Sequence, residues 1–132
     1  MNPVHLLLAM AGGALGAGLR YWLGASLLAR MADGWPWGTL VANLGGSLLA
    51  GLLFALLAER GPTGEALRAL LIVGVMGGLT TYSALMLELM AFGRAGQVDR
   101  ALAYLAVTLA GGLVLAWAGL RLGQILRGPI PG

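Results

Sequence analysis

The chain has 132 residues, of which 59% are hydrophobic and only 10% are charged, and its mean hydropathy is +0.88. A soluble domain of this length needs a more polar surface, so the composition predicts an all-α integral membrane protein. The absence of cysteine excludes disulfides and thiolate metal sites, and the single histidine, His5, argues against a histidine-based metal or catalytic centre. The formal charge of +3 comes with eight scattered arginines, which argues against a nucleic-acid-binding surface.

Four apolar stretches are long enough to cross a bilayer, for which about 20 residues are needed. Their approximate limits are residues 4–28, 39–58, 69–92 and 101–122. The sequence therefore predicts a single four-span membrane domain over residues 1–132. The first stretch lacks the basic leading region of a secretory signal, so we expect it to be retained as a span.

Short polar segments separate these stretches. Trp35 and Trp37 follow the first span and are expected to anchor the chain at the membrane interface. Residues 59–68 are expected to form the only loop of any size, and residues 93–100 separate the third span from the fourth. The tail after Arg121 contains two prolines and is expected to fray.

The distribution of arginines leaves the orientation of the chain open. With four spans, one side holds Arg60, Arg68, Arg121 and Arg127, and the other holds Arg30, Arg94, Arg100 and, if it reaches that interface, Arg20. The positive-inside rule therefore gives almost no preference. Either a weak bias selects one orientation, or the chain inserts both ways and two copies pair antiparallel, like an inverted repeat made from separate chains.

The third span has the composition of a broken helix. Gly77 and Gly78 are followed by hydroxyl residues at Thr80, Thr81 and Ser83, a combination that weakens a helix near the middle of the bilayer. Irregular backbone is tolerated there only when it is buried in protein or lines a watery path, and the ends of half-helices hold ions in transport proteins. The alternative is a glycine-rich kink whose hydroxyls bond back to the helix.

Polar residues recur at helical spacing on the other spans. A four-residue spacing places each set on one helical face, where the hydroxyls and amide form either a track of hydrogen-bond donors for a strongly hydrated ion or hydrogen bonds between helices. At this spacing the second span carries Thr39, Asn43 and Ser47 and the fourth carries Tyr104 and Thr108, while on the third span Ser83 lies five positions before Glu88. Glycine pairs at the same spacing, 12 with 16, 74 with 78, and 119 with 123, predict close helix packing.

Two charged residues fall within the spans. Arg20 lies near the end of the first span, where it either extends to the interface or makes a vestibule electropositive for anions. Glu88 lies near the far end of the third span, which is too close to the interface for the deep carboxylate of a proton-coupled antiporter.

Three segments carry a resemblance to a known family. Residues 12–21 (GGALGAGLRY), 38–51 (GTLVANLGGSLLAG) and 74–88 (GVMGGLTTYSALMLE) resemble, in order, three motifs of the Fluc (CrcB) family of fluoride channels: GGxxGAxxRY, GTLxxNxxGSFxxG and GxxGGxTTFSTFxxE. The resemblance covers nearly the whole chain, and it is strong because the three motifs occur in order in a four-span chain of this length.

The resemblance implies a fluoride-selective channel for passive export of cytoplasmic fluoride across the cell membrane. It implies an antiparallel, dual-topology dimer with two pores and a third span broken at mid-membrane. A structural sodium ion at the dimer interface would be held by the backbone carbonyls of Gly77 and Thr80. Arg20 would sit by a vestibule. The fluoride path would include Asn43, Thr39, Tyr82, Ser83, Leu85, Glu88, Tyr104 and Thr108.

The chain departs from the family motifs at several positions. Tyr82 and Leu85 replace two phenylalanines whose ring edges face the ion, and Leu48 and Ala84 replace a phenylalanine and a threonine. Tyrosine keeps the positive aromatic edge, whereas leucine loses it. Either the chain works as a homodimer with a simplified pore, or a paralogous subunit supplies the missing groups in a heterodimer.

Two other functions compete with the channel. A small proton-coupled multidrug exporter is also short and antiparallel, but it would need a glutamate in the first span, and residues 4–28 contain none. A membrane subunit that only scaffolds a partner would leave the broken helix and the polar stripes without a role.

Overall fold

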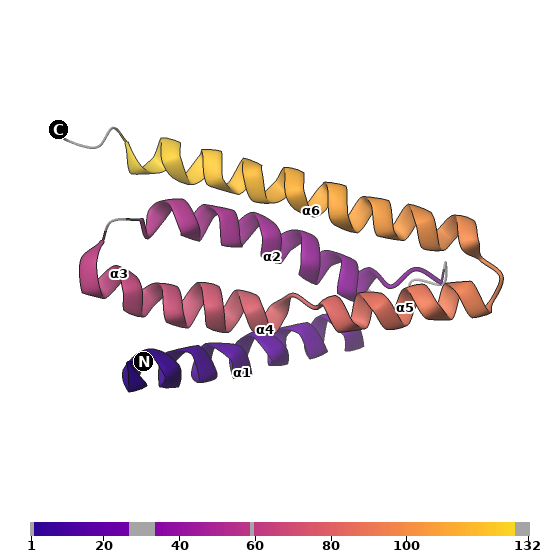
Figure 1. Cartoon of the computed structure of the whole chain (residues 1–132), viewed down its shortest axis with the longest axis horizontal. Coiled ribbons are helices and arrows are strands. Elements are labelled where there is room, and N and C mark those ends of the chain that lie inside the picture. The colour runs from indigo at the N-terminus through magenta and orange to yellow at the C-terminus, as the bar shows by residue number, and fades with distance from the viewer. Residues whose placement is uncertain (1, 27–33, 59, 129–132) are drawn as a thin grey trace.

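The computed structural model describes residues 2–26, 34–58 and 60–128, which are helical apart from short connections (Figure 1). In chain order the elements are α1 (Pro3–Ala25), α2 (Trp37–Leu56), α3 (Gly61–Leu67), the π-helix η2 (Arg68–Met76), α4 (Gly77–Leu79), α5 (Tyr82–Arg94) and α6 (Val98–Arg127). The elements from α3 to α5 follow one another along a single rod, which bends away from a helical path only between α4 and α5.

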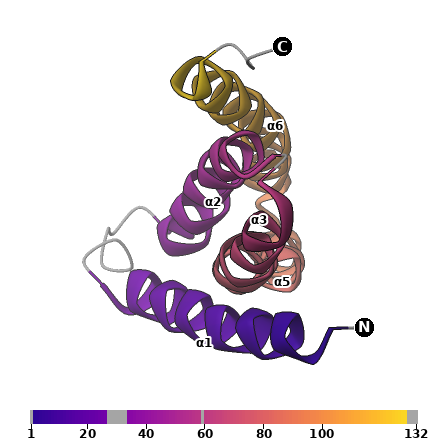
Figure 2. The same ribbon diagram turned by 90° about the vertical axis from the view of Figure 1, so that its left-hand side faces the viewer.

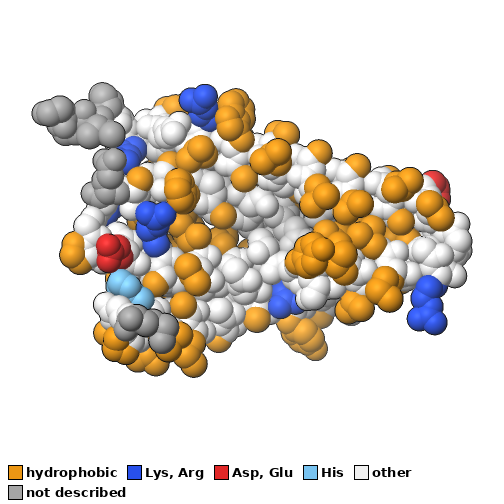
Figure 3. Space-filling view, viewed as in Figure 1, with side chains coloured by type: hydrophobic (Ala, Val, Ile, Leu, Met, Phe, Trp, Pro, Cys, Tyr) orange, Lys and Arg blue, Asp and Glu red, His pale blue; other side chains and the backbone are white. Residues whose placement is uncertain are grey.

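Four helical segments are long and apolar enough to cross a membrane: Pro3–Ala25, Trp37–Leu56, Gly61–Arg94 and Val98–Arg127. The prediction of an all-α protein with four spans is confirmed. Figure 3 shows why the surface suits lipid, because hydrophobic side chains spread along the visible face while charged side chains gather mainly toward its two ends.

Two predictions about the connections are wrong. Most of the loop expected at residues 59–68 is helix α3, which begins at Gly61 with a φ of +57° and continues through Pro62. Glycine adopts this left-handed conformation without steric cost, and proline suits the first helical turn. The tail does not fray at Arg121 either, since α6 continues to Arg127 and has Gly128 as its C-cap. Residues 129–132 with the two prolines, residues 27–28 of the first predicted span, and Arg30 lie outside the described residues.

Helix α1 packs against the third span through glycines on both sides. A Cβ on Gly12 would collide with the carbonyl oxygen of Leu70, and a Cβ on Gly16 would collide with that of Val75. A Cβ on Gly74 would lie 2.8 Å from the Cα of Gly12. The predicted close approach of the backbones is thus confirmed for these two glycine pairs.

Helices α2 and α6 run side by side along most of their length (Figures 1 and 2). A Cβ on Gly51 would collide with the carbonyl of Ala116, and a Cβ on Gly119 would collide with that of Leu48. Gly123 likewise lies against Leu52. Figure 2 shows α2 between α6 and α1, with the third span beside α2 and above α1, so both α2 and the third span pack against α1.

Candidate functional site

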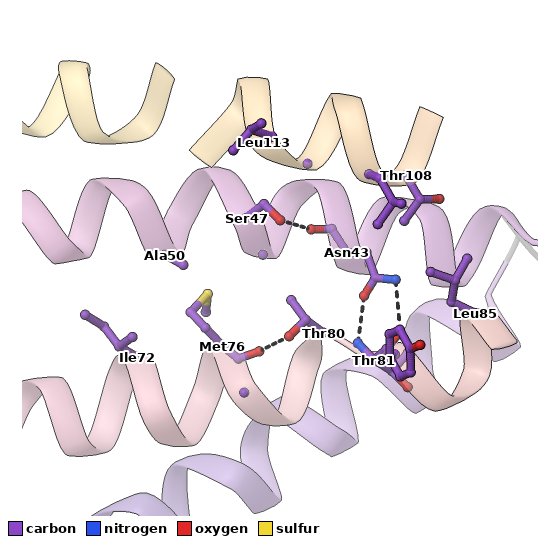
Figure 4. Close-up of a pocket in the computed structure, with 15 residues that line it drawn as sticks. Asn43, Ser47, Ala50, Ile72, Met76, Thr80, Thr81, Leu85, Thr108 and Leu113 are labelled. Carbon is purple, nitrogen blue, oxygen red and sulfur yellow. Dashed lines mark hydrogen bonds between the residues drawn. The ribbon is translucent and has the colours of Figure 1, made fainter. Parts of the chain in front are cut away.

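An open groove runs along the bundle between the third span on one side and α2 and α6 on the other (Figure 4). Its volume is about 570 Å³. Its walls are largely apolar, with polar groups near the point where the third span is interrupted. The polar lining includes Asn43, Ser47, Thr80, Thr81, Tyr82 and Thr108.

The interruption lies at two threonines rather than at the paired glycines. Gly77 has helical dihedral angles, with φ −62° and ψ −35°. Thr80 (φ −76°, ψ 152°) and Thr81 (φ −150°, ψ 120°) are extended. Their hydroxyls make local bonds: Thr80 Oγ1 donates to the carbonyl of Met76 at 2.9 Å, and Thr81 Oγ1 accepts from the amide of Ala84 at 3.2 Å. Threonine hydroxyls thereby compete with the helical hydrogen bonds of the backbone.

Asn43 binds the extended backbone directly. Its Nδ2 donates to the carbonyl of Thr81 at 3.1 Å, while the amide of Thr81 donates to Asn43 Oδ1 at 2.7 Å (Figure 4). Asn43 is buried, with 9% of its surface exposed. The Asn43 side chain therefore pairs both the amide and the carbonyl of Thr81, which lies in extended backbone outside the helices. It uses one of its two N–H donors for the Thr81 carbonyl.

These side-chain bonds leave two backbone carbonyls without their helical donors. In an unbroken helix the amide of Thr81 would donate to the carbonyl of Gly77, and the amide of Ala84 would donate to that of Thr80. Instead, the first donates to Asn43 and the second to the Thr81 hydroxyl. Gly77 and Thr80 both line the groove. The amides that would bond the Gly77 and Thr80 carbonyls in an unbroken α-helix thus have other partners.

Arg20 also acts at the end of α4. Its Nε donates to the carbonyl of Gly78 at 3.1 Å, and the side chain is partly buried. This bond ties the Arg20 guanidinium to the interruption. A cation at the carboxyl end of a helix is favourable, since it meets the negative end of the helix dipole.

A second polar cluster surrounds Glu88. Thr39 Oγ1 donates to Glu88 Oε1 and the hydroxyl of Tyr104 donates to Glu88 Oε2, each at 2.6 Å. Tyr104 is fully buried, and its ring meets those of Trp35 and Phe92 edge-on at centroid distances of 6.0 and 6.1 Å. Three of the residues expected along a fluoride path thus form one network, contributed by α2, α5 and α6.

The other expected residues are less closely joined. Thr108 lines the groove and is 7% exposed, and its hydroxyl has no hydrogen-bond partner within the described part of the chain. Ser83 is exposed and lies 3.3 Å from the Thr81 hydroxyl, while Ser47 donates to the carbonyl of Asn43 in its own helix. Tyr82 is 73% exposed and Leu85 only 3%, and both line the groove.

Thr81 is the site residue that sequence reasoning missed. It meets Asn43 through its backbone and caps α5 with its side chain. The doubled threonine before a new helix was the available signal, since an N-cap hydroxyl three residues before a helical amide is a common helix start. Among residues 2–26, 34–58 and 60–128, no three His, Cys, Asp or Glu side chains lie close enough together to hold a metal ion.

Comparison with known proteins gives one consistent result. Residues 7–120 match the family described as CrcB-like protein, Camphor Resistance (CrcB). The chain is 58% identical over 122 residues to a "Fluoride-specific ion channel FluC" of Xanthomonas euvesicatoria pv. vesicatoria, with 92% of each chain covered. It is 48% identical over 128 residues to a protein of the same name from Thermus thermophilus, covering 97% of this chain and 100% of the relative. The chain therefore belongs to the CrcB-like family.

Proposed function

We propose that this protein is a fluoride-specific ion channel of the plasma membrane that lets cytoplasmic fluoride leave passively. It is a multi-pass membrane protein and a channel rather than an enzyme. The names of its relatives support fluoride as the ion, and the four spans support a membrane location. The observation that carries the proposal within this chain is the groove beside Asn43 and Thr81, where hydrogen-bond donors line an otherwise apolar surface.

The donors in this groove suit a small anion. Asn43 keeps one N–H free of the Thr81 carbonyl, and the buried Thr108 hydroxyl is unpaired within the described residues. Helix α5 starts at Tyr82, and the first amides of a helix carry partial positive charge. A strongly hydrated ion such as fluoride gives up water only where such donors replace it. The Glu88 network with Thr39 and Tyr104 extends the polar path beyond the groove.

A second copy of the chain, inserted antiparallel, would complete the path. The groove is open along one face, and polar groups in contact with lipid are costly. The near balance of arginines between the two sides favours insertion in both orientations. In such a dimer the interruption at Thr80 and Thr81 lies at mid-membrane, at the seam between the subunits, and each subunit contributes to two pores.

A structural sodium ion fits the released carbonyls of Gly77 and Thr80. Two carbonyls from each of two antiparallel chains would give four neutral oxygen ligands, which is the kind of ligand that broken helices offer to sodium. The bound ion would supply a fixed positive charge at the seam. Asn43 and the Thr81 hydroxyl take the two amides that would otherwise bond these carbonyls.

The position of Tyr82 favours a homodimer. Tyr82 is largely exposed beside the groove, so its ring is available to a partner or to the ion, whereas Leu85 packs into the chain's own core with Leu40 and Phe92. In a homodimer each chain therefore supplies one aromatic ring edge, that of Tyr82. A heterodimer with a paralogous subunit is the alternative, in which the partner supplies the second ring.

Fluoride efflux from liposomes tests the proposal. Purified protein is reconstituted into vesicles loaded with potassium fluoride or potassium chloride, and release is followed with ion-selective electrodes after valinomycin is added. We expect rapid release of fluoride and retention of chloride. If vesicles with this chain alone release no fluoride and a co-expressed paralogue restores release, the heterodimer is favoured. Equal release of fluoride and chloride would refute a fluoride-specific channel.

Asn43→Ala provides the matching variant. The substitution removes both contacts to the Thr81 backbone and one donor from the groove, so we expect a folded dimer with sharply reduced flux. Size-exclusion chromatography checks the dimer before flux is compared. Unchanged flux would remove Asn43 from the ion path.

A further inference from the structure

A separate basic pocket lies at the turn between α2 and α3, away from the groove. Its volume is about 260 Å³, and it is lined by Leu57, Arg60, Gly61, Glu65 and Arg68. Because α2 ends at Leu56 and the next helix begins at Gly61, this turn joins two membrane-spanning segments and lies at the edge of the apolar belt. Lipid headgroups occupy this level of a bilayer.

The two arginines of the pocket are each held by a neighbour that leaves most of the guanidinium free. Arg60 Nε donates to the carbonyl of Leu56 at 2.9 Å, which orients the group and leaves its terminal N–H donors without a partner among the described residues. The Arg68 guanidinium lies 4.9 Å from the centre of the Phe54 ring. Stacking on an aromatic ring orients a guanidinium without using its N–H groups.

Neither arginine is neutralised within the described chain. Glu65 lines the pocket as well, but it is exposed and forms no ion pair with Arg60 or Arg68 within the described residues. Two oriented guanidinium groups without a carboxylate partner are a recognised arrangement for binding a phosphate, which accepts several N–H bonds at once.

The surroundings of the pocket favour a phosphate that carries acyl chains. Phe54 is 52% exposed on the outer surface of α2, and Leu57 forms an apolar wall of the pocket itself. A free phosphate makes no use of such apolar surface, whereas a phospholipid places its phosphate at the arginines and its chains against the exposed side of α2.

We propose that Arg60 and Arg68 form a binding site for the phosphate of an anionic glycerophospholipid. The Phe54 ring orients Arg68 and contacts an acyl chain of the bound lipid close to its headgroup. The site binds anionic lipid in preference to zwitterionic lipid, because the added ammonium of phosphatidylcholine meets two like charges. It is independent of ion conduction, since none of its residues lines the groove.

Native mass spectrometry of the intact detergent-solubilised protein tests the site. The protein is titrated with an equimolar mixture of phosphatidylglycerol and phosphatidylcholine, and bound lipid is counted. If each arginine raises the affinity for phosphatidylglycerol over phosphatidylcholine about fivefold, the two together predict a preference of roughly 25-fold. Arg60→Gln with Arg68→Gln is expected to abolish this preference, and Arg68→Gln alone, which keeps the Arg60 bond to α2, is expected to lose about fivefold.

Arg94→Gln is the matched control, because Arg94 is an exposed arginine at the other end of the third span. It should retain the full preference for phosphatidylglycerol. An unchanged preference in the double variant would overturn the site. Displacement of phosphatidylglycerol by millimolar inorganic phosphate would also overturn the proposal, since it would identify the site as one for free phosphate rather than lipid.

Discussion

Asn43 and Thr81 are joined by two hydrogen bonds that run in opposite directions, one from the side-chain amide to the backbone carbonyl and one from the backbone amide to the side-chain oxygen. The carboxamide does for this extended peptide what a neighbouring strand does in a sheet. Because Asn43 belongs to α2 and Thr81 lies between α4 and α5, the pair attaches the interrupted backbone of one span to the middle of another.

Asn43→Asp keeps the hydrogen bond from the Thr81 amide and removes the one to the Thr81 carbonyl. A carboxylate still accepts from the Thr81 amide but faces the Thr81 carbonyl without a donor, and it adds negative charge to the proposed fluoride path. We expect the initial rate of fluoride release to fall at least about tenfold, which corresponds to about 1.4 kcal/mol in the barrier to permeation. Val41→Ala, a change at an exposed position on the same helix, should leave the rate unchanged. A wild-type rate for Asn43→Asp would contradict the proposed role of this donor.

Thr81→Val tests whether the hydroxyl keeps the helix interrupted. Valine has the same shape but cannot accept from the Ala84 amide, so the N-cap of α5 is lost, at a cost of about 1 kcal/mol. The Ala84 amide can then donate to the Thr80 carbonyl oxygen. An oxygen that accepts this hydrogen bond is a poorer ligand for a cation. If the proposed sodium site exists, we therefore expect sodium to stabilise the purified protein less in this variant.

Thr81→Ser is the matched control, because serine keeps the accepting hydroxyl at this position. The measurement is the thermal unfolding midpoint in sodium compared with that in a large organic cation. If Thr81→Val and Thr81→Ser respond equally to sodium, the cap does not control the carbonyls.

Gly12→Ala and Gly13→Ala form a pair that tests the packing of α1. A Cβ on Gly12 would collide with the Leu70 carbonyl, whereas a Cβ on Gly13 meets no atom within 4 Å. Forcing α1 away from the third span should cost about 1–3 kcal/mol at position 12 and much less at position 13. Unfolding in increasing denaturant detergent measures the difference, and equal stability of the two variants would show that the helices do not approach as closely as described.

Tyr104→Phe and Glu88→Gln test the network around the carboxylate. Tyr104→Phe removes a hydrogen bond of 2.6 Å to Glu88 and leaves a carboxylate oxygen without its donor in a partly buried site, at an expected cost of about 1.5–3 kcal/mol. If the two side chains act as a unit, the double variant will be less destabilised than the sum of the single ones by at least about 0.5 kcal/mol. Additive effects in this cycle would mean that the two groups do not interact in the membrane.

The spans were predictable because a membrane helix satisfies its own backbone. A long apolar run leaves the chain few structures other than a helix, and the four runs in this sequence became the four long helices of the fold. The glycine pairs were predictable for the same kind of reason, since a four-residue spacing places small residues on one face whatever they pack against. The loop expected at residues 59–68 failed because its polar composition does not prevent a helix once Gly61 has turned the chain.

The candidate site was only partly predictable. The sequence singled out Asn43, Thr80, Glu88 and Tyr104 as polar residues within apolar spans, but their partners lie between 16 and 49 positions away or belong to the backbone. Nothing local to Arg20 indicates that it bonds to the Gly78 carbonyl 58 residues later.

Apolar length, residue size and helix propensity act locally, and they are enough to specify four membrane-spanning segments with close glycine contacts and a weak point in the third. The position of the interruption depends instead on how the spans pack. Thr80 and Thr81, rather than the glycines, have extended backbone. The amide of Thr81 donates to Asn43 of α2 instead of to the carbonyl of Gly77, as it would in a continuous helix. A hydrogen bond between two spans depends on how they pack, and packing is a property of the assembled bundle.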